Sequence, residues 1–511
     1  MQSNSDPRLE LLDAGVVVGH LVSDGSVYGF LAEHRRRLFP DVMFADLFGS
    51  GRGRPSVPAD VVATVMVLQA LEGLSDRDAV DALRTDIKWK VAAGVSLVDE
   101  GFHPTVLTLW RNRLRVSDQP ERIFDAVKAV VAETGVLAKR TRRALDSTLL
   151  DDAVQTQDTV AQLVSVIRRV RRQVPAAGEV AVSAHDYEAG GEPVCAWDDP
   201  VARDELVTGL VNDALAILDR LEDADLDAQQ VELVGLLALV AGQDVEPGDT
   251  EGTWRIARGT VPNRVISTVD PEARHMHKSP SQYRDRYKAH VAVEPETGII
   301  TGCDLTPANA GDGPVGVALL AGEPSDLEVL GDSAYGSGPV RAELAAAAHT
   351  AVIKPWPLLG NPRLGDDQFH RDDFTVDHQA GTVTCPQGQT VPISPKGHAT
   401  FGARCRQCPL RNRCTASQTG KTFNFTPHDE LLVRARADWR NGVGVDTYRH
   451  YRPMVERTLA WIVANGHRRV RYRSVERNRL GLSLRATAIN LRRLINLGLH
   501  HGPNGWAITT T

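Results

Sequence analysis

The sequence predicts a mixed α/β core with an all-α domain before it, a helical insertion within it and a small cysteine-rich insertion near its end. Three observations support this fold class. Helical spacing of apolar residues dominates the first 135 positions, and short β-branched runs alternate with helical patterns from residue 262 to 375. Four of the six cysteines also crowd between residues 385 and 414.

Changes in these patterns set the expected unit boundaries. The units are a helical N-terminal domain over residues 1–135, a catalytic core over 136–150, 262–375 and 430–500, a helical insertion over 151–261, and a cysteine-rich, zinc-ribbon-like insertion over 376–429.

Composition places the chain among globular proteins. With 511 residues, of which 42% are hydrophobic, it can bury a large core and divide into several units. No apolar run approaches the roughly 20 residues of a membrane helix, and the polar start MQSNSDPRLE lacks the basic and apolar regions of a signal peptide. We therefore expect a cytoplasmic protein.

Charge is distributed unevenly along the chain. The formal net charge is −7, yet residues 401–500 hold 20 Lys plus Arg against 6 Asp plus Glu. The densest part is GHRRVRYRS at 466–474, with Arg468, Arg469, Arg471 and Arg473, whose guanidinium groups suit phosphate oxygens. A solvated helix face is the plainer alternative. We favour binding to DNA phosphates, because the cluster has one sign and is dense.

The N-terminal domain is expected to contain at least three packed helices. Val61, Val65 and Leu68 lie at helical spacing within residues 57–72, and Ser75 with Asp78 caps a second helix. A third helical pattern is HPTVLTLWRNRL at 103–114. Short helices joined by a tight turn are compatible with a DNA-binding helix-turn-helix, and equally with a scaffold.

The core pattern begins with RRALDSTL at 142–149, a predicted strand that contains Asp146. After the helical insertion, a hairpin is predicted over 288–307, and strands at 327–332 and 351–355 alternate with helices. Asp332 falls where a buried strand gives way to a loop, which is where open α/β sheets place their chemistry. By itself, an Asp after a strand is more often a turn former.

A third acid, Glu456, is expected on a helix over residues 448–463. Its apolar residues Val455, Leu459 and Ile462 share one face, while Arg449, Arg452 and Glu456 line an adjacent face. The helix can therefore pack on the sheet and still present an acid to the strand ends. Pro453 must lie in the first turn of this helix or kink it.

Asp146, Asp332 and Glu456 together suit two hard divalent cations such as Mg²⁺, or Mn²⁺ in its place. Mg²⁺ prefers oxygen ligands, and two such ions about 4 Å apart can activate the attacking oxygen and neutralise the leaving oxygen in a displacement at phosphorus. Arginines nearby would hold DNA against the acids.

These motifs resemble the DDE transposases of bacterial insertion sequences. The residues that carry the likeness are ALDST with Asp146, VLGDSAYG with Asp332 and YRPMVERTL with Glu456, together with DPEARHMHK, YKAHVAVEPETGIITGCDLTPAN and CRQCPLRNRC. The likeness is to the insertion-sequence-4-like group, which has a helical N-terminal domain and a cysteine cluster. This chain differs from the group's signature at Arg449, where a tyrosine is usual, and at Val463, where a lysine is usual.

The resemblance implies a ribonuclease H-like core that cuts the ends of its own element and joins the freed 3′ hydroxyls to target DNA. It implies that Asp146, Asp332 and Glu456 are the Mg²⁺ ligands and that Arg452 contacts DNA phosphate. A homodimer on the terminal inverted repeats and an association with the nucleoid would follow. Two alternatives remain: a metal-dependent nuclease without strand transfer, and a non-catalytic DNA-binding protein derived from a transposase.

The cysteines are considered separately. Cys405, Cys408 and Cys414, with Cys385 upstream, have the residue types of a tetrahedral structural Zn²⁺ site, although only one close Cys-x-x-Cys pair is present. Reduced thiols in a cytosolic protein are the alternative.

Overall fold

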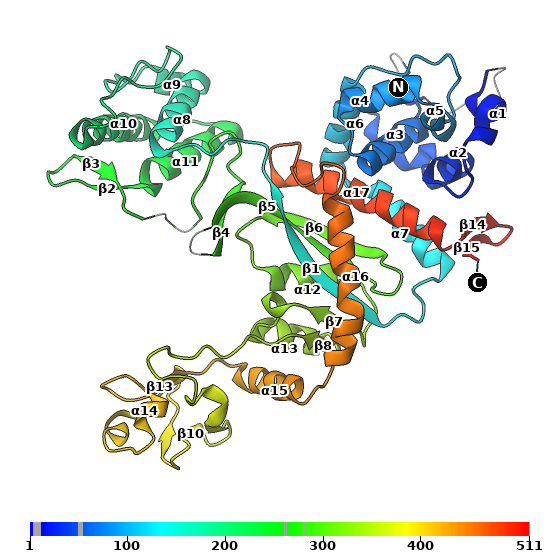
Figure 1. The fold of residues 1–511 in the computed structure, drawn as a ribbon. Coiled ribbons are helices and arrows are strands. Elements are labelled where there is room, and N and C mark those ends of the chain that lie inside the picture. The colour runs from blue at the N-terminus through cyan, green and yellow to red at the C-terminus, as the bar shows by residue number, and fades with distance from the viewer. Residues whose placement is uncertain (4–11, 50–54, 260, 262, 280–281, 510–511) are drawn as a thin grey trace.

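The computed structural model describes residues 1–3, 12–49, 55–259, 261, 263–279 and 282–509. A twisted mixed sheet lies at the centre, crossed on one face by the long helix α16 (Val445–Val463). The N-terminal helices, a helical insertion and a cysteine-bearing unit form three lobes around it (Figure 1). The molecule is thus an assembly of packed units around a mixed α/β core.

Six strands make up the central sheet: β1 (Arg142–Asp151), β4 (Arg274–Ser279), β5 (Gln282–Val293), β6 (Ile300–Pro307), β7 (Glu328–Gly331) and β8 (Thr350–Ile353). The order across the sheet is β6-β5-β1-β7-β8, and β4 pairs with the first part of β5. Strand β5 is antiparallel to both β1 and β6, whereas β7 is parallel to β1 and to β8. The strands predicted at 142–149, 327–332 and 351–355 are present as β1, β7 and β8.

Helices join the parallel strands, as the alternating pattern predicts. Helix α12 (Asp312–Leu319) precedes β7, and α13 (Gly338–Ala346) connects β7 to β8. Together with Leu145, Val329, Tyr335 and Ile353, the apolar residues of these connections form one core beneath the sheet. The opposite face packs against α16, where Val455 and Ile462 join Ala144, Leu330 and Val352.

Seven helices are described in the N-terminal region: α1 (Ala14–Val18), α2 (Val27–Leu38), α3 (Ala59–Glu72), α4 (Asp76–Thr85), α5 (Ile87–Ala93), α6 (Thr105–Val116) and α7 (Arg122–Thr134). The three helical patterns recognised in the sequence correspond to α3, α4 and α6. Ser75 and Asp78 form the expected capping box at the start of α4. Helix α3 is buried along nearly its whole length, so it is the central helix of this region.

Helix α17 (Val475–Asn496) lies between the N-terminal helices and the sheet (Figure 1). Leu480, Leu484 and Leu491 belong to the core of the N-terminal helices, whereas Leu482 and Ile489 belong to the core between the sheet and α16. The two cores therefore share one helix. This sharing explains why α17 carries buried polar residues, since neither of its faces meets solvent broadly.

The helical insertion has its own core. It contains α8 (Thr159–Gln173), α9 (Pro175–Gly178), α10 (Pro200–Leu221), α11 (Ala228–Gln243) and the short hairpin of β2 (Val245–Pro247) and β3 (Trp254–Ile256). Leu163, Leu210 and Leu237 are fully buried within this cluster. Of the residues outside 151–261, only Val265 belongs to it among the positions described.

The cysteine-bearing unit is built from short strands and turns. It contains β9 (Thr375–Asp377), β10 (Thr382–Thr384), β11 (Thr390–Pro392), β12 (His398–Thr400), α14 (Arg411–Cys414) and β13 (Thr422–Asn424). Phe374, Phe401 and the thiols of Cys405 and Cys414 form its small core. Helix α15 (Asp429–Arg440) leads back to α16, and its first residue, Asp429, is ion-paired with Arg371. The chain closes with a hairpin of β14 (Leu499–Gly502) and β15 (Gly505–Ile508).

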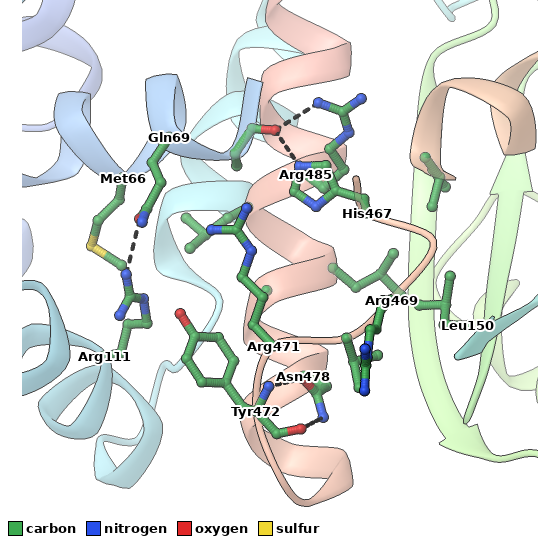
Figure 2. A pocket seen from close by; sticks show the side chains of 16 residues that line it. Met66, Gln69, Arg111, Leu150, His467, Arg469, Arg471, Tyr472, Asn478 and Arg485 are labelled. Carbon is green, nitrogen blue, oxygen red and sulfur yellow. Dashed lines mark hydrogen bonds between the residues drawn. The ribbon is translucent and has the colours of Figure 1, made fainter. Parts of the chain in front are cut away.

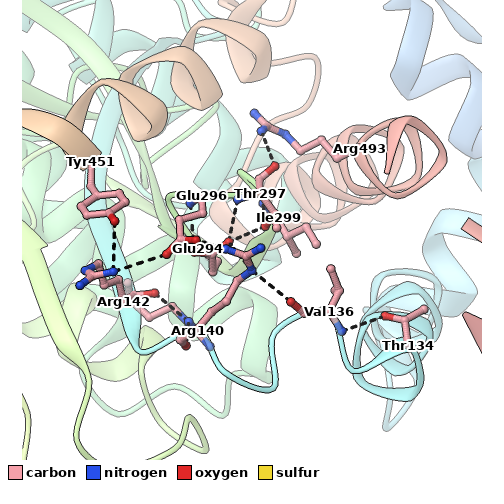
Figure 3. A network of polar contacts seen from close by, with 11 residues as sticks. Thr134, Val136, Arg140, Arg142, Glu294, Glu296, Thr297, Ile299, Tyr451 and Arg493 are labelled. Carbon is pink, nitrogen blue, oxygen red and sulfur yellow. Dashed lines mark hydrogen bonds and ion pairs between the residues drawn. The ribbon is translucent and has the colours of Figure 1, made fainter. Parts of the chain in front are cut away.

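A polar network fixes the predicted 288–307 hairpin to its neighbours (Figure 3). Glu294 is fully buried, and its carboxylate accepts hydrogen bonds from the backbone N–H groups of Glu296 and Thr297. Arg142, at the start of β1, donates to the hydroxyl of Tyr451 on α16 at 3.2 Å. These contacts hold the turn, β1 and α16 in one arrangement, which sets the position of the acids described next.

Candidate functional site

Asp146 and Arg452 form a buried ion pair where β1 meets α16. An Arg452 guanidinium nitrogen lies 2.7 Å from Asp146 Oδ2, and a second donates to the carbonyl oxygen of Leu145 at 2.7 Å. The side chains are 8% and 11% exposed for Arg452 and Asp146 respectively. The backbone N–H of Ser147 also donates to Asp146 Oδ1. The Asp146 carboxylate is therefore both oriented and neutralised within the protein.

For both Asp146 and Arg452, burial and the charge of the ion-pair partner change the pKa in opposite directions. Burial raises the pKa of Asp146, the nearby charge of Asp332 raises it further, and Arg452 acts in the opposite direction. Burial would lower the pKa of Arg452, but the charges of Asp146 and Asp332 and the neighbouring Tyr448 raise it overall. Arg452 thus remains fully cationic beside the acids.

Asp332 follows β7 in an extended conformation and caps a short 3₁₀ turn. Its side chain accepts a hydrogen bond from the Ala334 N–H at 2.9 Å. Tyr335 of the same turn folds under the sheet and is buried. Burial, together with the charges of Asp312, Asp146 and Asp332, raises the pKa of its hydroxyl. The predicted loop at the end of the buried strand is therefore present, and it places Asp332 beside Asp146.

Glu456 lies one helical turn after Arg452 on α16, and its side chain is exposed. Tyr448, one turn before Arg452, lies within electrostatic range of all three acids. Burial raises the pKa of Tyr448, and the charges of Asp332, Asp146 and Glu456 add to that rise, while Arg452 lowers it. Pro453 lies in the middle of α16 rather than in its first turn, and the helix continues through it.

These acids meet only part of what a divalent metal ion requires. Three carboxylates supply the hard oxygen donors that Mg²⁺ prefers. Within the described part of the chain, however, no three His, Cys, Asp or Glu side chains lie close enough together to hold a metal ion. Arg452 already occupies the carboxylate of Asp146. The carboxylates are the right ligand type for Mg²⁺. Their positions in this structure, however, favour the ion pair between Asp146 and Arg452 over a bound metal ion.

The arginines predicted to bind DNA are used in different ways. Arg449 and Arg473 are exposed, and Arg452 is buried in its ion pair. Arg468 donates to the carbonyl oxygen of Leu149, and Arg469 to that of Asp152, so both hold the end of β1. Their side chains remain largely exposed to solvent.

The segment after α16 also docks the N-terminal helices onto the core (Figure 2). His467 and Arg485 both donate to the carbonyl oxygen of Ala70, at 2.9 and 2.6 Å, at the C-terminal end of α3. Arg471 donates to the carbonyl oxygens of Gly73 and Leu74 in the next turn. These residues line a pocket of about 70 Å³ between the two units. Part of the arginine cluster therefore serves an internal interface, because the free carbonyls at a helix end need donors.

The four cysteines of the cysteine-bearing unit face one small cavity. Cys385, Cys405, Cys408 and Cys414 all line a space of about 20 Å³, next to Phe374 and Phe401. All six cysteines in the chain are free thiols. Burial raises the pKa of the Cys414 thiol, and the other three thiols raise it further. The expected convergence is present, but no three of these described thiols are close enough to hold a metal ion, so the geometry does not support zinc.

A polar cluster behind Asp146 was missed in the sequence. The hydroxyl of Ser147 donates to Asp312 Oδ1 at 2.9 Å, and the ammonium of Lys288 lies 3.1 Å from the same oxygen. His290 is fully buried beside them, and burial lowers its pKa to about 4. Successive residues of a strand point to opposite faces, so Asp146 and Ser147 necessarily face different sides of the sheet. This alternation in the sequence could have predicted that Ser147 faces a second polar cluster on the side of the sheet opposite to Asp146.

Comparison with protein families addresses the class of the protein. Residues 31–113 match the model described as a transposase domain (DUF772), which covers most of the N-terminal helices. Residues 384–495 match the transposase DDE domain, which covers the four clustered cysteines, Arg452 and Glu456. Two separate segments of the chain are therefore similar to transposase domains.

Asp146 and Asp332 lie outside both matched segments. No curated protein and no solved structure matches the chain. In the described part of the chain, every helix is too short or too polar to cross a membrane.

Proposed function

We propose that this protein is a DDE transposase, which cleaves DNA at the ends of its own element and joins the freed 3′ hydroxyls to target DNA at one metal-dependent site. The observation that carries the proposal is the meeting of Asp146 and Asp332 on neighbouring strands, under a helix that presents Glu456. The strand order β6-β5-β1-β7-β8, with two antiparallel pairings followed by two parallel pairings, supports a ribonuclease H-like core.

Asp146, Asp332 and Glu456 would hold Mg²⁺ or Mn²⁺. When bound, such ions lower the pKa of the attacking water or hydroxyl and stabilise the leaving oxygen. Arg452 must release Asp146 for that arrangement, and a DNA phosphate is the group that competes for a guanidinium. Arg449, Arg468, Arg469 and Arg473 would contact the DNA backbone from the exposed surface. Arg471, also predicted to bind DNA, would do so only by releasing the carbonyl oxygens of Gly73 and Leu74. Helix α4, which keeps an exposed face beside the buried α3, is the candidate site for recognition of the terminal inverted repeats.

The finer assignments rest on separate support. The helical N-terminal match and the cysteine-bearing unit favour the insertion-sequence-4-like group. Joining two element ends in one complex calls for a homodimer acting on the nucleoid DNA. A structural zinc has in its favour only that four free thiols line one cavity, and their spacing in this structure is too wide to hold the ion. Metal analysis of the purified protein tests it: about one zinc per chain supports the assignment, and its absence leaves reduced thiols.

Asp332→Asn tests the proposed reaction. The DNA flanking the coding region supplies the element ends, and strand transfer is measured on gels with labelled ends and a target plasmid. We expect the wild-type protein to give joined products with Mg²⁺ or Mn²⁺, and Asp332→Asn to give none while binding the ends as tightly. Glu343→Gln on α13, a carboxylate away from the acids, is the matched control and should retain activity.

Other outcomes of this experiment separate the alternatives. Cleavage without joined products would assign a nuclease. Binding of the ends without cleavage by the wild-type protein, in either metal, would assign a non-catalytic DNA-binding protein.

A further inference from the structure

Lys354 lies directly beside Asp332 at the ends of two neighbouring strands. The last pair in the parallel ladder of β7 and β8 is Gly331 with Ile353, so Asp332 and Lys354 are the next residues on each strand. The backbone N–H of Lys354 still donates to the carbonyl oxygen of Gly331, at 3.4 Å. Pro355 then follows, and a residue before proline favours an extended backbone.

Alternation places the Lys354 side chain on the same face as the acids. Leu330 and Val352 both pack in the core beneath α16. Asp332 and Lys354 each lie two residues further along, and a strand returns to the same face every second residue. Asp146, two residues after Ala144 of that core, follows the same rule on β1. Three adjacent strands thus present Asp146, Asp332 and Lys354 toward the side covered by α16.

The charge of Lys354 is available, in contrast to the cations deeper in the site. Its side chain is exposed, and in the part of the chain that the structure describes its ammonium makes no ion pair or hydrogen bond. Arg452 is paired with Asp146, and Lys288 is paired with Asp312. An exposed cation at the rim of a group of acids has the chemistry to hold a phosphodiester close to them.

We propose that Lys354 is a substrate-positioning residue whose ammonium holds a DNA backbone phosphate beside Asp332. This role rests on the proposed function, since it requires DNA at the strand ends. Lys354 lies outside both transposase matches and contributes charge rather than metal ligation. It would act together with the exposed Arg449, on the N-terminal half of α16, to guide the strand into the site.

Acetylation footprinting of the wild-type protein tests the contact directly. Exposed lysines are acetylated with an N-hydroxysuccinimide ester, with and without a duplex oligonucleotide of mixed sequence, and quantified by mass spectrometry. We expect DNA to reduce acetylation of Lys354 several-fold. Lys139 and Lys396, which are exposed and remote from the strand ends, are the internal controls and should react equally in both samples. Equal acetylation of Lys354 with and without bound DNA would overturn the proposal.

Salt dependence of DNA binding supplies a readout that a purely structural role would not move. Lys354→Gln should weaken binding and reduce the slope of log affinity against log salt by roughly one unit, the change expected for one lost phosphate contact. Lys354→Arg should restore the slope, and Lys396→Gln should leave it unchanged. An unaltered slope in Lys354→Gln, with wild-type binding intact, refutes the role of Lys354 alone. Failure of the wild-type protein to bind DNA would instead refute the proposed function.

Discussion

At the residue scale, the main finding is that Asp146 is held by an internal cation. A buried carboxylate is costly unless it is paired and hydrogen-bonded, and Arg452 with the Ser147 N–H satisfies both needs. The sequence predicted that Asp146, Asp332 and Arg452 belong to one site. It did not reveal that Arg452 pairs with Asp146, because that contact depends on how α16 docks across the sheet.

Arg452→Gln tests the energetic role of this pair. Removing the guanidinium leaves Asp146 buried and uncompensated, so the free energy of unfolding should fall by about 3–5 kcal/mol. Adding Asp146→Asn removes the stranded charge and should recover much of the loss. Arg449→Gln, an exposed position on the same helix, is the control and should stay within about 0.5 kcal/mol of wild type. Urea unfolding measures all four proteins, and no recovery in the double variant would contradict the pairing.

His467 predicts a pH dependence of stability. Burial, aided by the charges of Arg485 and Arg471, lowers its pKa from 6.5 to about 4. Between these pH values His467 is protonated in the unfolded chain but not in the folded protein. The free energy of unfolding should therefore fall as the pH drops from 6.5 toward 4. His467→Gln keeps a donor for the Ala70 carbonyl but cannot titrate, and should show a shallower fall. Some fall should remain because His290, with a pKa of about 4, behaves similarly.

At the element scale, the strands and helices with strong local patterns were predictable. Patterns among neighbouring residues predicted three features that the structure contains: the strand 142–149, the helix 57–72 and the capping box of Ser75 and Asp78. The contact between the arginine-rich segment 466–474 and the end of α3 was not predictable. Arg471 and its neighbours donate to the carbonyl oxygens at the end of α3, and a helix end offers the same carbonyls whatever its sequence.

Gly73→Ala tests the docking of α3 against this segment. Gly73 ends α3 with φ of +73°, and an added Cβ would lie 1.9 Å from the carbonyl oxygen of Asn465. Gly135 ends α7 with φ of +63° and open space around it. Gly135→Ala should therefore cost only the left-handed strain, about 1 kcal/mol, and Gly73→Ala clearly more. Melting temperatures of the two variants compare the costs, and equal values would mean that the close approach is absent.

At the scale of the whole molecule, α17 makes the N-terminal helices and the sheet one structural body. Its Leu484 packs with the N-terminal core and its Leu482 with the sheet core. The sequence predicts a helical domain over residues 1–135. Periodicity shows that a helix has apolar faces but not which unit each face contacts, so the role of α17 could not be predicted. The consequence for function is that helices expected to recognise DNA are rigidly connected to the acids through α17.

A matched pair of leucine substitutions tests this unity. Replacing Leu484, or the fully buried Leu237 of the helical insertion, by Ala should lower the free energy of unfolding by about 2–5 kcal/mol, because each substitution leaves a cavity. The two substitutions should lower hydrogen-exchange protection in different parts of the molecule. Hydrogen exchange read by mass spectrometry should show lower protection in both α3 and β1 for Leu484→Ala, since the two cores share α17. Leu237→Ala should lower protection only within residues 151–261, whose core is separate. Loss of protection in α3 alone for Leu484→Ala would mean that the N-terminal helices open independently, and recognition of DNA would then be flexibly linked to cleavage.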